Sequence, residues 1–73
     1  MDNIEFNQHC QPLSAGQPLQ IVLITGASLT GFLLRYRRAT NYEGSLELET
    51  SQGIRVLLSS SIESITPSAG FNA

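Results

Sequence analysis

Apolar residues recur at alternate positions through most of this chain, which is the pattern of β-strands with one buried face. Turn-forming residues interrupt the alternation between successive apolar segments, and Gly26 and Gly53 are two of them. The alternation predicts five short antiparallel strands arranged as a meander. They lie at residues 19–25, 28–36, 45–49, 54–58 and 62–66.

The second predicted strand carries a glycine in its middle. Strict alternation there would place Leu33 on one face and Phe32, Leu34 and Tyr36 on the other. Gly31 within a strand indicates a sharp bend, a bulge or the close approach of another backbone. Small barrels need such a point to turn a strand around a corner. We therefore predict a mainly β fold, a strongly bent five-stranded barrel of the SH3, OB or Sm type.

The first eighteen residues differ from the strand region. Asp2 or Asn3 can cap a short helix that carries Ile4 and Phe6, and the prolines that follow prevent a long one. We divide the chain into a lead segment with a possible short helix (1–18), the barrel (19–67) and a flexible tail (68–73).

The length and net charge of the chain limit the classes of function that it can have. The chain has 73 residues, 41% of them hydrophobic, which allows one small domain with a core that is marginal by itself. Small domains without disulfides or metals gain stability by self-association, so we expect a homo-oligomer. A net charge of -2 excludes a strongly basic nucleic-acid binder, although all four basic residues are arginines.

Catalytic and metal-binding patterns are absent from the sequence. His9 and Cys10 are the only histidine and cysteine, and adjacent residues rarely ligate one metal together. We predict a non-enzymatic protein with no metal and no cofactor. A single cysteine forms no internal disulfide, so a reducing, cytoplasmic location is expected. No apolar run approaches the roughly 20 residues that cross a bilayer, so we expect no membrane association.

One cluster combines basic and aromatic residues where the second strand ends. Arginines beside aromatic and amide side chains suit single-stranded RNA, because they neutralise phosphates and stack on bases. The same arginines could instead pair with nearby glutamates or lie in solvent. Arg55 is expected to pair with a glutamate on the adjacent strand. The candidate RNA-binding residues are Arg35, Arg37, Arg38, Asn41, Tyr42, Ser59 and Ser60.

Two segments resemble the Sm-like (LSm) family, and its bacterial Hfq branch in particular. Residues 17–26, QPLQIVLITG, followed by Leu29-Thr30-Gly31, are similar to the first family motif. Residues 62–68, IESITPS, are similar to the last strand and its closing proline. The resemblance implies a short helix, a bent five-stranded barrel and a hexameric or heptameric ring. In that ring, the fourth strand of one copy pairs with the fifth of the next, which leaves no open sheet edge.

The resemblance also implies RNA-based regulation, but the RNA-binding residues of Hfq are not matched. Leu58, Ser59 and Ser60 stand where Hfq has an aromatic residue, a lysine and a histidine around its pore. Val22 stands where Hfq has the tyrosine that stacks adenines. Serine still forms hydrogen bonds with bases or phosphates, so Ser59 and Ser60 remain candidates. An Sm-like scaffold without RNA binding is a further alternative.

A second family with the same barrel is also similar. The order of residues 41–49, NYEGSLELE, with Arg55 and Ile62 after it, resembles the Rof proteins, which are acidic and bind the termination factor Rho. That resemblance implies a protein partner such as Rho in place of RNA, and a monomer or dimer in place of a ring. The mass of the assembly separates the two alternatives.

Overall fold

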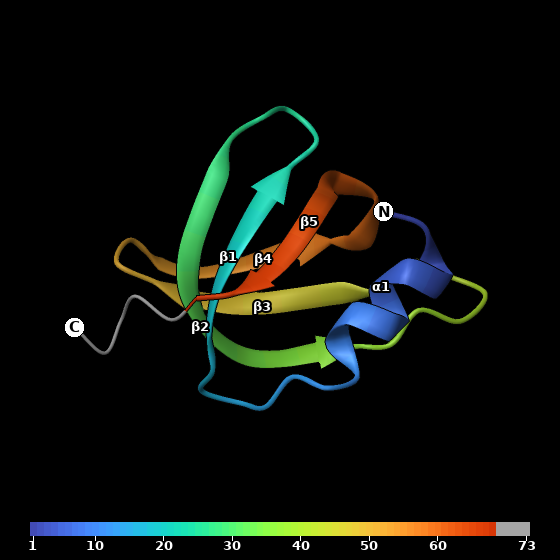
Figure 1. The fold of residues 1–73 in the computed structure, drawn as a ribbon, viewed down its shortest axis with the longest axis horizontal. Coiled ribbons are helices and arrows are strands. Elements are labelled where there is room, and N and C mark those ends of the chain that lie inside the picture. Colours follow the sequence, from blue (N-terminus) through green and yellow to red (C-terminus); the bar gives the residue numbers. More distant parts are fainter. Residues whose placement is uncertain (69–73) are drawn as a thin grey trace.

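A short helix precedes five antiparallel strands that curl into a barrel-like sheet (Figure 1). The computed structural model describes residues 1–68, so residues 69–73 of the predicted tail lie outside the described residues. The predicted mainly β fold with a short amino-terminal helix is confirmed. The elements are α1 (Asn3–Cys10), β1 (Pro18–Leu23), β2 (Ser28–Arg37), β3 (Ser45–Thr50), β4 (Gly53–Leu58), the 3-10 turn η1 (Ser59–Ser61) and β5 (Ile62–Pro67).

The fifth strand departs from a simple meander. The strand order in the sheet is β4-β3-β2-β1-β5, so β1 to β4 form a meander but β5 returns to pair with β1. The predicted meander is therefore correct for four strands and wrong for the fifth. Within residues 1–68, β4 and β5 are the two edges of the sheet, and each leaves one side of its backbone unpaired.

Strand β2 bends so that it pairs with β1 along its first half and with β3 along its second half. Gly31 lies at the bend, opposite Leu19 of β1. A methyl group added at Gly31 would lie 2.6 Å from the backbone oxygen of Glu49 in β3, which is closer than atoms can approach. The close backbone approach that the sequence indicated at Gly31 is confirmed.

A register shift in β2 changes which side chains face the core. Leu33 pairs with Leu48 of β3, but Arg35 pairs with Glu47, so one residue of β2 is skipped between them. As a result Tyr36 packs against the core, and Arg35 is exposed. Strict alternation, which would place Tyr36 on the same face as Phe32, is wrong beyond this bulge.

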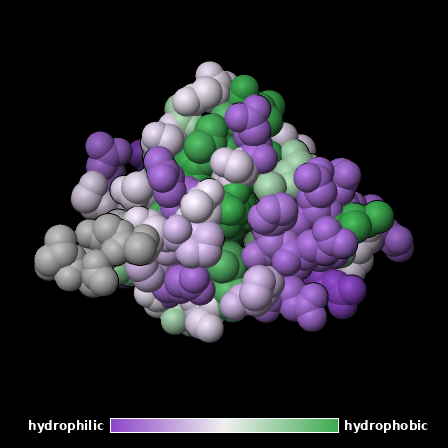
Figure 2. Space-filling model, in the orientation of Figure 1, coloured by the Kyte–Doolittle hydropathy of each residue, from purple (hydrophilic) through white to green (hydrophobic). Residues whose placement is uncertain are grey.

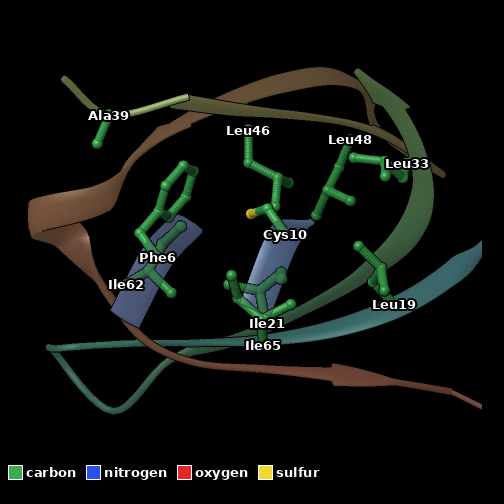
Figure 3. Close-up of a cluster of buried hydrophobic side chains, with 10 residues drawn as sticks. All are labelled: Phe6, Cys10, Leu19, Ile21, Leu33, Ala39, Leu46, Leu48, Ile62 and Ile65. Carbon is green, nitrogen blue, oxygen red and sulfur yellow. The ribbon is translucent and has the colours of Figure 1, made fainter. Parts of the chain in front are cut away.

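Helix α1 closes one end of the barrel. The Asp2 carboxylate accepts a hydrogen bond from the Glu5 backbone N–H at 2.8 Å, which caps the helix. Phe6 and Cys10 lie one turn apart and point between the strands, as Figure 3 shows. Burial raises the pKa of the Cys10 thiol to about 11. The buried core consists of Phe6, Cys10, Leu19, Ile21, Leu33, Ala39, Leu46, Leu48, Ile62 and Ile65.

Candidate functional site

The segment between β2 and β3, residues 38–44, is tied down at its first half by α1. The Asn7 side chain forms two hydrogen bonds of 2.8 Å with the backbone of Ala39, donating to its oxygen and accepting from its N–H. One turn earlier, Asn3 donates to the backbone oxygen of Thr40 at 3.4 Å. The spacing of Asn3 and Asn7 places both amides on the same face of the helix. This segment is therefore held close to α1.

The second half of the same segment is tied to η1. The backbone N–H of Ser59 donates to the oxygen of Gly44 at 2.9 Å, and the Gly44 N–H donates to the Ser59 hydroxyl at 3.2 Å. The Glu43 carboxylate accepts hydrogen bonds from the hydroxyl and the N–H of Ser60 at 2.6 and 3.2 Å. These bonds lower the pKa of Glu43.

The two candidate serines thus have structural partners. Ser59 is only 1% exposed, and its hydroxyl accepts a hydrogen bond from the buried backbone N–H of Gly44. An RNA contact by Ser59 stays a prediction. Ser60 is exposed, but its hydroxyl proton is directed to Glu43. That carboxylate would repel a phosphate brought to Ser60.

Tyr42 stands at the tip of the tethered segment. Its side chain is 82% exposed, and Asn41 beside it is also exposed. The Thr40 backbone N–H donates to the backbone oxygen of Tyr42 at 3.0 Å, which forms a local turn. An exposed aromatic ring on an ordered segment is suited to stacking against a base or another flat group.

The arginines of the sequence cluster are divided between two faces. Arg35 pairs with Glu47 at 2.8 Å, and Arg37 follows on the same outer face of β2 opposite Ser45. These residues and the side chains of Val56 and Leu58 line a hollow of about 600 Å³, which we call the outer trough. Arg38 does not line this trough. The three arginines therefore form no single basic patch.

Arg38 lines a different hollow, between α1 and the end of β2, which we call the helix groove. It has a volume of about 470 Å³ and is lined by Ile4, Asn7, Gln8, Gln11, Tyr36 and Arg38. The Tyr36 ring meets Phe6 edge-on at a centroid distance of 6.4 Å, which anchors it from the core side. Figure 2 shows a hydrophilic surface over α1 and a hydrophobic band over β1. The groove thus combines an aromatic ring, carboxamides and one cation.

Arg55 does not form the expected ion pair. It lies opposite Leu48 of β3, and therefore on the other face of the sheet from Glu47 and Glu49. Its guanidinium donates to the Gln52 side-chain oxygen at 3.1 Å. The ion pair with Glu47 is made instead by Arg35, from the opposite side of β3.

The outer face of the β4 edge is apolar. Ile54, Val56 and Leu58 alternate along it with exposed fractions of 62%, 60% and 46%. We call these three residues the aliphatic stripe. They lie beside Glu49, Glu47 and Ser45 of β3, respectively, on the face away from the core.

Known proteins give no assignment for these surfaces. No protein-family model, curated protein or solved structure matches the chain.

Residues 1–68 contain no group of three or more histidine, cysteine, aspartate or glutamate side chains that could hold a metal ion. His9 is exposed, and its Nδ1 lies 2.9 Å from the backbone oxygen of Glu5. None of the helices within these residues has the length and apolar character needed to span a bilayer.

Neither the helix groove nor the aliphatic stripe was predicted from the sequence. The alternation of Ile54, Val56 and Leu58 was visible in the sequence, but only the strand pairing shows that these residues face away from the core. The groove depends on Tyr36 and Arg38 lying against α1, and no local pattern in the sequence indicates that proximity.

Proposed function

We propose that this chain forms a ring of identical copies, in which β4 of one copy pairs with β5 of the next, and that the ring binds single-stranded RNA. The observation that carries the ring is the pair of open edges at the two ends of one sheet. An open edge pairs readily with another strand, and a closed ring leaves none exposed. The resemblance to Sm-like proteins points to the same arrangement.

The aliphatic stripe supports pairing at β4 in particular. Soluble monomers seldom place three aliphatic side chains in a row on an unpaired edge strand, because such an edge promotes aggregation. Complete burial of one such side chain contributes roughly 1.5–3 kcal/mol, and a neighbouring strand covers part of each. A neighbouring copy therefore stabilises this edge through both backbone hydrogen bonds and apolar contact.

The RNA part of the proposal rests on the helix groove and on Tyr42. Tyr36 offers an aromatic ring, Gln8 and Gln11 offer donors and acceptors for a base edge, and Arg38 offers a positive charge for a phosphate. Tyr42 adds a second ring near the tip of the tethered segment. The net charge of -2 means that few phosphates are neutralised per copy, so binding by a single copy should be weak and repetition in a ring strengthens it.

The first test is the mass of the assembly. Native mass spectrometry should show about 47 or 55 kDa for six or seven copies of the 7.9 kDa chain. A chain that stays monomeric at all concentrations contradicts the ring and favours the protein-binding alternative, in which an acidic regulator meets a partner such as Rho.

The second test is RNA binding by variants with the same change of net charge. Arg38→Ala should weaken the binding of short uridine-rich and adenine-rich single strands about tenfold, because it removes a charged hydrogen bond to phosphate. It should also reduce the slope of log K against log salt by about 0.7 for each phosphate that is no longer neutralised. Arg35→Ala is the matched control, since the charge of Arg35 is already paired with Glu47.

Fluorescence anisotropy at low salt measures both variants. Equal affinity of the two variants would contradict a role for the helix groove. An intact ring that binds none of these RNAs would leave a scaffold without RNA binding.

A further inference from the structure

Each open edge of the sheet carries a single charged residue, and the two charges have opposite signs. Arg55 is the only charged residue of β4, and Glu63 is the only charged residue of β5. Both side chains are exposed. Gln52, the hydrogen-bonding partner of Arg55, is neutral and leaves the charge in place. Neither Arg55 nor Glu63 has an ion-pair partner within residues 1–68.

Glu63 also has an unusual place in its strand. Leu23 of β1 pairs with Ile62 and Val22 pairs with Ser64, so Glu63 is the extra residue of a bulge. The extra residue of a bulge has no paired residue in the neighbouring strand. Glu63 therefore has no ladder partner in β1, and its side chain is exposed.

Head-to-tail pairing of copies brings the two charges together. Arg55 is the third of six residues in β4, and Glu63 is the second of six in β5. When the two strands overlap fully and run antiparallel, Glu63 lies opposite Leu57, two positions from Arg55. At about 3.3 Å per residue this is about 7 Å or less along the strand, which arginine and glutamate side chains can span.

Pairing of β4 with β4 of a second copy is the main competitor. It would bring two aliphatic stripes together, so apolar contact alone favours it. In the antiparallel register that puts the two stripes on one face, however, Val56 pairs with Val56, and the two Arg55 side chains lie on the other face, two positions apart, where like charges repel. That symmetric contact would close as a dimer and would leave both β5 edges open.

We infer that Arg55 and Glu63 determine the polarity of assembly: their attraction favours β4 against β5, and the repulsion between two Arg55 residues disfavours β4 against β4. The inference rests on the proposed ring and adds the residues that select a ring over a symmetric dimer. Charges on strand edges serve this purpose in other sheets, where they exclude unwanted pairings.

Charge reversal tests this assignment. Arg55→Glu gives a copy with two acidic edges, and Glu63→Arg gives a copy with two basic edges. Each variant alone should form the head-to-tail contact about fivefold more weakly, because an attraction becomes a repulsion of similar size. Since every contact in a ring changes at once, the midpoint concentration of assembly should rise well above that of the natural chain. The double variant R55E/E63R restores opposite charges and should restore assembly.

Mixing the two single variants gives a sharper result. A ring in which acidic-edged and basic-edged copies alternate has opposite charges at every contact. Equal amounts of R55E and E63R should therefore assemble together when neither does so alone at the same concentration. The assemblies should contain equal numbers of the two variants and hence an even number of copies. Native mass spectrometry with one variant isotopically labelled measures this composition.

Controls separate charge at the edges from charge in general. Arg38→Glu and Glu5→Arg change the net charge by the same amounts at residues outside β4 and β5, and should leave assembly unchanged. Circular dichroism verifies that each variant is folded, and recovery in the mixture verifies it independently. High salt should reduce the differences among the variants, because it screens exposed charges.

Three results would overturn the inference, in distinguishable ways. If the natural chain assembles and both single variants assemble equally well, the charges do not determine polarity, although the ring stands. If the natural chain is monomeric, the ring and this inference both fail. Statistical mixing of the two variants, with no preference for equal numbers, would also overturn the role of the charges.

Discussion

Phe6→Ala should unfold a large fraction of the protein at room temperature. Phe6 is fully buried and is the largest side chain in the core, where α1 closes the barrel. Truncating a buried phenylalanine costs about 3–5 kcal/mol, which approaches the whole stability that a chain of this size derives from one core. Thermal unfolding followed by circular dichroism should show a greatly lowered or absent transition.

Ile4→Ala is the matched control for Phe6→Ala. It removes an aliphatic side chain from the same helix, but Ile4 is 71% exposed, so the midpoint of unfolding should change little. Equal effects of the two variants would show that α1 acts through helix propensity and not through the Phe6 side chain. Because association adds stability, both should be compared at one protein concentration.

Gly31→Ala should destabilise the fold by about 1–3 kcal/mol through overpacking. The sign of this change in stability is informative. Replacing glycine by alanine where the backbone is unstrained normally stabilises a protein by about 0.4–1 kcal/mol, because it reduces the conformational entropy of the unfolded chain. Gly31 has no positive φ, so backbone conformation does not forbid a side chain there. The destabilisation follows from space alone, since the methyl group would meet the Glu49 backbone oxygen at 2.6 Å.

Urea unfolding of Gly31→Ala and Thr30→Ala measures this effect. Thr30 is the exposed neighbour of Gly31 in β2, so its truncation changes only local strand propensity. A Gly31→Ala protein as stable as the natural chain would mean that β2 and β3 can separate at the bend without cost.

The elements of this fold were largely predictable from local patterns. All five strands occur within two residues of their expected bounds, and the capped helix follows Asp2, because alternation, turn glycines and caps act over short distances. The return of β5 to β1 was not predictable from alternation, since strand order depends on residues far apart in the sequence. The bulge before Arg35 was equally hidden, because no glycine or proline marks it.

The candidate site was less predictable than the fold. Arg35, Arg37 and Arg38 are close in the sequence, which suggested one basic cluster. In the fold, however, Arg37 lines the outer trough and Arg38 lines the helix groove. The partners of Ser59 and Asn7 come from segments at least fifteen residues away. The RNA-binding role of these residues stays a prediction.

The tethered segment from 38 to 44 has a consequence for any ligand that contacts Tyr42. Hydrogen bonds to Asn7 and Ser59 already hold this segment in the free chain. Fixing a flexible residue costs roughly 1–2 kcal/mol of backbone entropy, and here folding itself has met that cost before the ligand arrives. Capture by Tyr42 should therefore be rapid and should leave the shape of the receiving surface almost unchanged.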